Sequence, residues 1–294
     1  MADLKYLTYV TLGRGLKSVF NIVSPRKLDP SRETSDVKLM MFCGKSGTKM
    51  LKPVLISIYK RWKKIPKVVI VTDGTDVDQI KESVTFWPYP LTVKTWKDCA
   101  DYFAKQNKKD LVAYAEKNIW GKKLISILAE GEQAPTLYCD TDVLWFDEPS
   151  LPRDNSVPIR MASDDLHCYS EPMIHYFKTD DLLKKNPLNA GVIYVNGSMF
   201  NRYKDFDKVT KYLSEHYDNR TEQTTFAMLA NEIGDRWSLN DILLTTEDTY
   251  RPFPSYYGKD KKHFARHHVS TKKWWFWRDA IYVVMSGKNG TVKK

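Results

Sequence analysis

The chain has 294 residues, of which 42% are hydrophobic and 13% aromatic, so its composition excludes a disordered chain and supplies the core of one large domain or two small ones. It contains no run of about 18 apolar residues and no recognisable secretory leader, which predicts a soluble, cytoplasmic protein. Lys and Arg outnumber Asp and Glu by 46 to 36, and the net charge of +10 favours an anionic partner: a nucleic acid, a phospholipid surface or a phosphorylated small molecule.

The first 36 residues are expected to form an appendage to the main domain. Apolar residues between Tyr6 and Val23 have the spacing of an interrupted amphipathic helix, and a polar segment follows up to Asp36. A packing arm is the favoured interpretation of this segment, and a peripheral contact with a membrane surface is the alternative. Residues 37–294 contain no good linker, so we expect them to form a single domain.

From residue 37 onward, apolar strands alternate with helical patterns. Buried strands are predicted at 37–43 and 68–72, with a helix at 50–62 between them. A strand at 91–93, helices between 97 and 128, and a strand at 136–139 continue the pattern, which is typical of a parallel α/β sheet covered by helices. The rest is more mixed, with a strand at 192–195 and helices at 203–217 and 223–233.

The clearest chemical signal is an apolar strand that ends in two carboxylates. Asp140 and Asp142 follow the strand at 136–139 and stand one residue apart. Buried charges are costly unless something neutralises them. At the carboxyl end of a parallel strand, where open α/β sheets bind ligands, a divalent cation shared with a diphosphate would do so. A lone Asp-x-Asp pair is also common in solvated turns, but its apolar flanks here favour a metal site.

Four segments, taken together, are more specific than any one motif. They read LYCDTDVLW at 137–145, LNAGVIYVN at 188–196, Glu222-Gln223 before an apolar helix, and HHVSTKKWW at 267–275. In this order they resemble the DxD strand end, the NAGV strand, the Asp-Gln helix start and the H-[FY]-x-G-x-x-K-P-W segment of GT-A nucleotide-sugar glycosyltransferases, most clearly the glycogenin and lipopolysaccharide galactosyltransferase group. The resemblance covers residues 37–278. It implies a GT-A fold, with a Rossmann-like, mostly parallel central sheet flanked by helices and a mixed carboxyl-terminal half on the acceptor side.

The resemblance implies that Asp140, Asp142 and His267 bind Mn²⁺ or Mg²⁺. Two carboxylates and one imidazole suit Mn²⁺ and leave positions for two phosphate oxygens, so that the cation would neutralise the leaving diphosphate. Lys273 is expected to place an ammonium on the same diphosphate as its charge grows, although outside this segment it would be interpreted as a solvated lysine. His268 is the rival of His267 as the metal ligand.

Further residues are expected around the donor. Asn189 and Gly191 fit a close approach of the backbone and an amide to the sugar, with a turn at the start of the strand as the alternative. Glu222 and Gln223 are expected to hydrogen-bond the donor sugar or take part in catalysis, although Glu-Gln is also an ordinary helix start. The other expected donor contacts are Phe42, Cys43, Gly44, Lys122 or Lys123, Thr141, Asp164 and Asp165.

The activity implied by these residues is transfer of a hexosyl or pentosyl unit from a nucleotide-diphosphate sugar, favoured as a UDP-sugar, to a glycan or lipid-linked acceptor. The group that the chain resembles retains the anomeric configuration of the donor, so we expect retention. An inverting enzyme would need a base, and Asp164, Asp165 and Glu222 are the carboxylates available for that role.

Three features of the sequence keep other interpretations open. The group carries an acidic residue after its first strand, and residues 42–48 contain none; Ser270 and Trp274 replace its usual glycine and proline. The segment 44–53 partly mimics the phosphate loop of sugar-nucleotide pyrophosphorylases. An inactive, transferase-like binding protein is the second alternative.

Basic residues beside aromatics are also typical of nucleic-acid surfaces, but no RRM, KH or zinc-finger pattern accompanies them, so we expect no nucleic-acid partner. These residues are Lys259, Lys261, Lys262, Arg266, Lys272, Lys273 and Arg278, beside Trp274, Trp275, Phe276 and Trp277.

Overall fold

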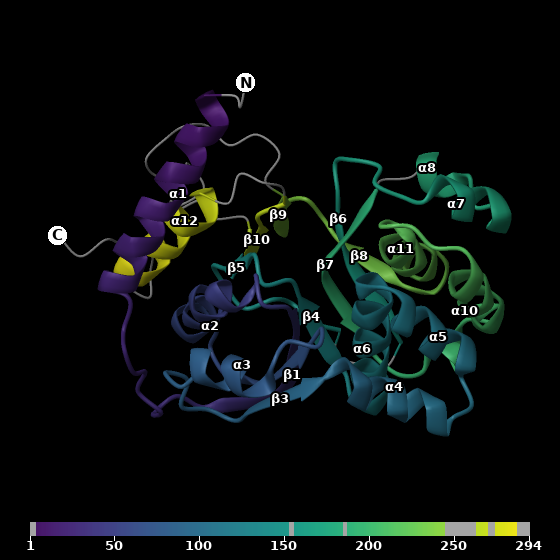
Figure 1. Cartoon of the computed structure of the whole chain (residues 1–294), viewed down its shortest axis with the longest axis horizontal. Helices are drawn as coiled ribbons and strands as arrows, with labels where there is room; N and C mark the ends of the chain where they lie inside the picture. Colours follow the sequence, from purple (N-terminus) through teal and green to yellow (C-terminus); the bar gives the residue numbers. More distant parts are fainter. Residues whose placement is uncertain (1–3, 153–155, 185–186, 245–262, 270–273, 287–294) are drawn as a thin grey trace.

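The computed structural model of the chain describes residues 4–152, 156–184, 187–244, 263–269 and 274–286. A seven-stranded sheet in the order β3-β2-β1-β4-β7-β6-β8 forms the centre of this part of the molecule (Figure 1). Its strands are β1 (Thr34–Cys43), β2 (Ile65–Thr72), β3 (Leu91–Thr95), β4 (Thr136–Cys139), β6 (Ile159–Ser163), β7 (Leu188–Val195) and β8 (Asp235–Trp237).

Strand direction brings several chain ends to one edge of this sheet. β1 lies parallel to β2 and β4, β2 lies parallel to β3, and β6 lies parallel to β8. β7 runs antiparallel to both of its neighbours, β4 and β6. The residues that follow β1, β2, β4 and β6 therefore share an edge with the residues that begin β7. The mostly parallel α/β sheet predicted from the sequence is confirmed.

The continuous apolar runs of the strands are explained by burial on both faces of the sheet. In β1, Met40 packs in one hydrophobic cluster, whereas Leu39 and Met41 pack in another on the opposite face, and all three are fully buried. A strand that alternated apolar and polar residues would have left one face open to water.

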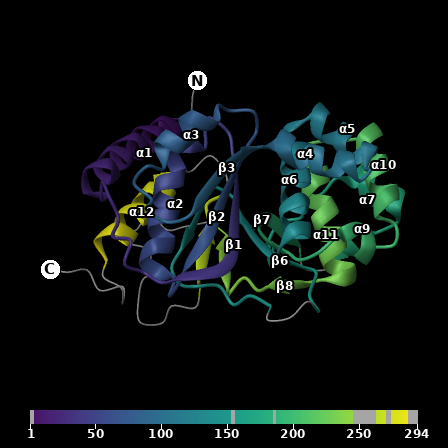
Figure 2. The same ribbon diagram turned by 90° about the horizontal axis from the view of Figure 1, so that it is seen from below.

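Helices cover both faces of the sheet (Figures 1 and 2). One cluster contains residues of α4 (Trp96–Lys105), α5 (Lys109–Lys117), α6 (Ile119–Gln133), α7 (Glu171–Phe177), α8 (Asp181–Lys184), α9 (Met199–Arg202), α10 (Phe206–Glu215) and α11 (Thr221–Ile233). The other contains residues of α1 (Leu4–Val23), α2 (Thr48–Arg61), α3 (Val77–Ser83) and α12 (Trp274–Met285).

A second, three-stranded sheet lies beside the first. It has the order β5-β10-β9, from β5 (Val143–Trp145), β10 (Ala265–His267) and β9 (Ile242–Leu244). β10 pairs antiparallel to β5, with His267 opposite Val143, and parallel to β9. This pairing brings the end of β10 next to the Asp140–Asp142 loop, although more than a hundred residues separate them in the sequence.

The amino-terminal segment forms one continuous helix, α1, rather than an interrupted one. It packs on α12, where the rings of Phe20 and Trp277 lie 5.7 Å apart, and it leaves Ile22 82% exposed. β1 begins at Thr34, inside the segment expected to be an appendage, and the division after residue 36 stays a prediction. None of the helices that the structure describes is long and apolar enough to cross a membrane.

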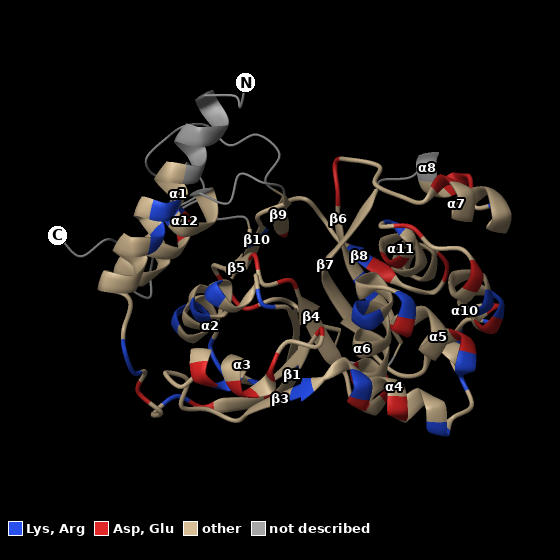
Figure 3. Cartoon of the chain, viewed as in Figure 1, with Lys and Arg blue, Asp and Glu red and all other residues tan. Residues whose placement is uncertain are grey.

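Of the basic and aromatic residues at the carboxyl end, those whose side chains the structure describes are buried rather than exposed. Arg266, Arg278, Trp275, Phe276 and Trp277 are all buried, because the aromatic rings of α12 join the core and the two guanidinium groups bind Asp279. On the outer helices α4, α5 and α10, basic and acidic residues are interspersed (Figure 3). The lysines of this group, Lys259, Lys261, Lys262, Lys272 and Lys273, lie outside the described residues.

Candidate active site

The end of β4 positions the first carboxylate. Asp140 directly follows this buried strand, and its backbone N–H donates to the carbonyl of Gly191 in β7 over 2.8 Å. The backbone N–H of Val143 then donates to the carbonyl of Asp140, which forms a tight turn that brings Asp142 back toward the same side. Two carboxylates therefore face one point at the edge of the sheet, as the sequence pattern predicts.

His267 completes a group of three metal-ligating side chains with these carboxylates. Its Nε2 lies 3.2 Å from Asp142 Oδ1 and 3.6 Å from Asp140 Oδ2, and one ligand atom from each of the three residues lies within 4.8 Å of the others. Burial lowers the pKa of His267, but the two carboxylates outweigh burial and raise the pKa overall. A concentration of negative charge that attracts a proton also attracts a divalent cation, and two carboxylate oxygens with one imidazole nitrogen fit such an ion.

A hydrogen-bonded chain holds the imidazole in orientation. His267 Nδ1 lies 2.9 Å from Asn189 Oδ1, which can only accept, so Nδ1 carries a proton and Nε2 is the nitrogen that faces the carboxylates. Asn189 Nδ2 donates to Asp164 Oδ2 over 2.9 Å, and Asp164 accepts the backbone N–H groups of Asp165 and Leu166. These contacts place Asn189 and Asp164 directly behind His267, whereas their contact with a donor sugar stays a prediction.

Gly191 makes room for that imidazole. A Cβ atom at this position would lie 2.1 Å from Cε1 and 2.2 Å from Nδ1 of His267, distances that two non-bonded atoms do not reach. The structure gives one reason for the missing side chain, namely room for the His267 ring, and a close approach of this backbone to a donor sugar stays a prediction. His267 packs directly on the bare backbone of β7.

A buried lysine and a buried glutamate lie beside the first carboxylate. Lys123 Nζ, on α6, is 3.2 Å from Asp140 Oδ1 and 3.3 Å from Glu222 Oε1, and it donates to the carbonyl of Ala190. The phenolic hydroxyl of Tyr138 donates to Asp140. Burial raises the pKa of Glu222 to about 7, because the opposing effect of Lys123 is smaller and Asp140 adds to the increase. Within the described structure, the ammonium of Lys123 is the charged partner of Glu222 Oε1.

These groups line a cavity of about 230 Å³ at the edge of the sheet. Glu222 and Gln223 begin α11 there; the Gln223 amide donates to the carbonyl of Cys168 and accepts weakly from the backbone of Ala190. Trp120, 38% exposed at the start of α6, lies at the rim. Sequence reasoning missed several lining residues, since a tryptophan and a short loop carry no pattern of their own: Trp120, Cys168, Asn219, Arg220 and Val269.

The structure also resolves two pairs of rival residues. Lys122 turns away from the carboxylates: its ammonium donates to the carbonyl of Asp73 over 3.0 Å and lies above the ring of Trp96, so Lys123 is the lysine of the site. His268 binds Asp279 instead of the two aspartates, so His267 is the histidine of the site. Lys273 lies outside the described residues.

The expected nucleotide contacts gather at the neighbouring ends of β1 and β2. A Cβ atom on Gly44 would lie 2.3 Å from Asp73 Oδ2, so the residue after β2 places a carboxylate beside residues 42–48, which contain none. Thr141 lies against the backbone of Gly47, at the start of α2. Phe42 and Cys43 pack in the core on either face of the sheet, and burial raises the pKa of Cys43 to about 12. Asp165 is exposed and does not line the cavity.

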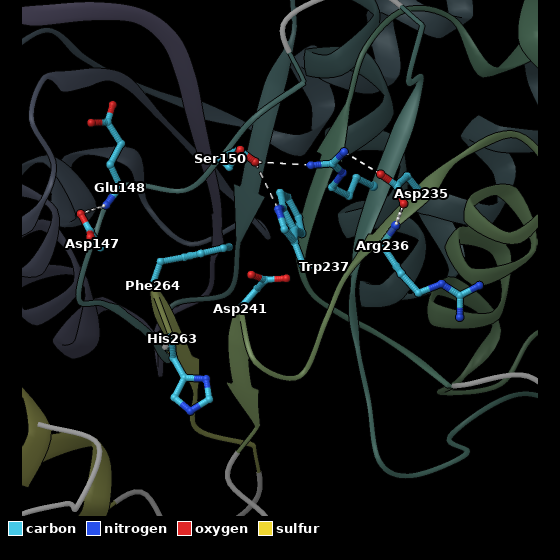
Figure 4. Close-up of a pocket in the computed structure, with 10 residues that line it drawn as sticks. Asp147, Glu148, Ser150, Asp235, Arg236, Trp237, Asp241, His263 and Phe264 are labelled. Atoms are coloured by element: carbon cyan, nitrogen blue, oxygen red, sulfur yellow. Dashed lines mark hydrogen bonds and ion pairs between the residues drawn. The ribbon is translucent and has the colours of Figure 1, made fainter. Parts of the chain in front are cut away.

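A larger cavity, of about 430 Å³, lies at the opposite ends of β5 and β10 (Figure 4). Its polar groups bind one another: Arg160 forms an ion pair with Asp235 at 2.6 Å, and the indole N–H of Trp237 donates to the carbonyl of Ser150. None of the three metal-ligating residues lines it. We therefore assign the chemistry to the smaller cavity.

Comparison with solved structures shows that this fold also occurs in glycosyltransferases. No protein-family model and no curated protein sequence matches the chain. Among solved structures, the bifunctional glycosyltransferase WbbM aligns with 88% of the chain at a TM-score of 0.53 and 12% identity, and the chain spans only 51% of the length of WbbM. Mouse xyloside xylosyltransferase 1 aligns with 81% of the chain, and with 99% of its own length, at 0.53 and 12%.

The galactosyltransferase LgtC, solved in complex with donor and acceptor sugar analogues, aligns with 84% of the chain and 95% of its own length at a TM-score of 0.52 and 10% identity. At such identities the likeness shows the fold. The seven-stranded, mostly parallel sheet with helices on both faces is the one that these enzymes share. The chain has the GT-A fold of glycosyltransferases.

Proposed function

We propose that this protein is a metal-dependent glycosyltransferase that moves a sugar from a nucleotide-diphosphate donor, favoured as a UDP-sugar, to a hydroxyl group of a glycan or lipid-linked acceptor. The observation that carries the proposal is the group formed by Asp140, Asp142 and His267 at the mouth of a cavity in a GT-A fold. Three ligands on one side of an ion leave its other positions open to the oxygens of a diphosphate.

The roles of the residues follow from their positions. Asp140, Asp142 and His267 would hold Mn²⁺ or Mg²⁺, which supplies charge neutralisation for the departing diphosphate when bound. Lys123 stands between Asp140 and Glu222, where its ammonium holds both carboxylates in place. Asn189 holds the His267 imidazole with its Nε2 toward the carboxylates. Lys273 is proposed as a further phosphate contact on the resemblance alone.

The transfer itself breaks the bond between the sugar's anomeric carbon and the diphosphate oxygen, forms a bond from the acceptor oxygen to that carbon, and releases the acceptor proton. We propose retention of the anomeric configuration, in line with the segments at 188–196 and 267–275. Glu222 and Gln223 line the cavity beside Asp140, where they would contact the donor sugar. With its pKa near 7, Glu222 can exist in both protonation states at neutral pH, so it can donate to or accept from a sugar hydroxyl.

The proposal is tested by donor hydrolysis and thermal shift with a panel of UDP- and GDP-sugars, each with and without Mn²⁺. We expect one donor to be hydrolysed slowly in the presence of Mn²⁺ and not in excess chelator. Production of a sugar nucleotide from a sugar 1-phosphate and a nucleoside triphosphate would identify a pyrophosphorylase instead. Donor binding without turnover in any acceptor extract would identify a binding protein. Proton NMR of the first product from an α-linked donor decides between retention and inversion.

A further inference from the structure

The two faces of β10 carry different chemistry. His267 points toward the aspartates, and its neighbours Arg266 and His268 point to the opposite face, as successive residues of a strand do. On that face both contact one carboxylate of α12: Arg266 Nη1 donates to Asp279 Oδ2 over 2.7 Å, and His268 Nε2 donates to the same oxygen over 3.0 Å. The three side chains are buried, with exposed fractions of 1%, 2% and 0% for Arg266, His268 and Asp279.

His268 also connects this cluster to the loop of the second metal ligand. Its backbone N–H donates to the carbonyl of Asp142 over 3.0 Å, and its Nδ1 lies 3.0 Å from the same oxygen. The imidazole stands edge-on to the ring of Phe276, with ring centres 5.4 Å apart, so packing and Asp279 together fix its rotation. A displacement of His268 would move the main chain of Asp142 on one side and that of His267 on the other.

Stability alone is a poor explanation for this buried charge. An apolar trio of similar volume would pack at least as well, because removing charges from water costs several kcal/mol for each ion. Burial raises the pKa of Asp279, but Arg266, His268 and Arg278 outweigh burial and lower the pKa overall, so the carboxylate stays ionised. The ionised carboxylate holds the donors of Arg266 and His268, the residues on either side of His267 in the sequence, at fixed positions.

We propose that Asp279 is a positioning residue for the metal site, which sets the separation of His267 and Asp142 through Arg266 and His268. The inference rests on the proposed metal-dependent function. It extends that function to α12, which carries Asp279. Helix α1 packs on α12 through the contact between Phe20 and Trp277.

The test measures Mn²⁺ binding to the full chain, alone and with UDP, by the EPR signal of free Mn²⁺. His268→Phe keeps an aromatic ring against Phe276 and removes both side-chain contacts. Asp279→Asn removes the charge. If Asp279→Asn does not fold, the pair Arg266→Met with Asp279→Leu replaces two of the buried ions by apolar groups and keeps the test open. The matched control is Glu130→Gln, which breaks a buried ion cluster at the other end of α6.

We expect each Asp279 or His268 variant to bind Mn²⁺ about 10 to 100 times more weakly than the wild type, as is usual when a group behind a metal ligand is lost. In donor hydrolysis, KM for Mn²⁺ should rise more than kcat falls, which a general loss of stability would not produce. The control should bind Mn²⁺ with wild-type affinity. Folded variants with wild-type affinity would overturn the positioning role and leave the metal site intact. A wild type that binds no Mn²⁺ would overturn the metal site, and the inference with it.

Discussion

Helix α6 carries a buried ion cluster near each of its ends, and the two clusters balance their charges differently. Near its start, Lys123 is the one lysine between two carboxylates, Asp140 and Glu222. Near its end, Glu130 is the one carboxylate between two lysines: Lys38 lies 3.0 Å away, and Lys94 contacts the other oxygen. Both glutamates are 3% exposed.

The two clusters differ in the groups that surround them and in their access to solvent. Glu130 has an excess of positive charge around it, and its lysines are long enough to reach partly into water, with side chains 14% and 24% exposed. At the Lys123 end, Asp142 adds a third carboxylate, and the groups border a cavity. Asp140 and Asp142 are 29% and 14% exposed, so their charges stand where a cation from solution can reach them. The comparison therefore separates a cluster closed by its own lysines from one that borders a cavity.

The largest expected effect comes from removing one carboxylate from the cluster at the Lys123 end of α6. Asp142→Asn keeps the shape of the side chain and halves the carboxylate ligands of the proposed ion. We expect the rate of Mn²⁺-dependent donor hydrolysis to fall by at least about 10³-fold, which corresponds to roughly 4 kcal/mol of lost transition-state stabilisation. Circular dichroism should show that the variant keeps its fold. A variant that keeps full activity, or wild-type activity that survives excess chelator, would contradict the metal mechanism.

At the Glu130 end of α6, the expected effect is on the stability of the fold alone. Glu130→Gln leaves Lys38 and Lys94 without a counter-charge, and breaking a buried pair from one side costs about 3 to 5 kcal/mol, toward the lower value here because the lysines are partly exposed. Urea denaturation measures the loss, and EPR should show unchanged Mn²⁺ affinity. Weaker Mn²⁺ binding in this variant would mean that the two clusters are coupled along α6.

The sequence was sufficient for the parts of the molecule that repeat a pattern. The second half of β1, residues 39–43, and β4 after Thr136 are apolar runs, and Asp140 and Asp142 follow β4 directly, so both the α/β sheet and the carboxylate pair could be predicted. The order of the four family-like segments led to the GT-A fold, which the solved structures confirm.

The rest depended on contacts between distant residues. β5 and β10 have three residues each, too few for a periodic signal, yet their pairing places His267 beside Asp142. Two adjacent lysines on a helix point in directions about 100° apart, and which of them faces the site depends on how α6 packs, so Lys122 and Lys123 could not be separated. Tyr138 read as one more apolar strand residue, although its hydroxyl binds Asp140.

A smaller effect, on the pH dependence of stability, is expected from Glu222. In the unfolded chain it releases its proton near pH 4.5, and in the folded chain near pH 7, so the folded state binds more protons between these values. The contribution of Glu222 to the free energy of unfolding is therefore greatest below pH 4.5 and falls by an amount on the order of 3 kcal/mol as the pH rises to about 7. Glu222→Gln should flatten this fall in urea denaturation with chelator present. Glu116→Gln, on the exposed side of α5, is the control, and an unchanged slope in Glu222→Gln would show that Glu222 does not titrate in this window.

The smallest expected change comes from adding a single methyl group to Gly191, on β7 beside His267. Gly191→Ala would place a Cβ atom 2.1 Å from the His267 ring, and the rigid backbone of β7 leaves the imidazole as the group that moves. Because that movement stretches both the Asn189 hydrogen bond and the approach to Asp142, we expect Mn²⁺ affinity to fall by about 10 to 100-fold, measured by EPR. Gly15→Ala is the matched control: no atom lies within 4 Å of the new methyl group, and alanine should stabilise the exposed helix α1 by up to about 1 kcal/mol without changing Mn²⁺ affinity. Wild-type Mn²⁺ affinity in Gly191→Ala would mean that His267 is not fixed by the bare backbone of β7, and that an ion at this site does not depend on its position.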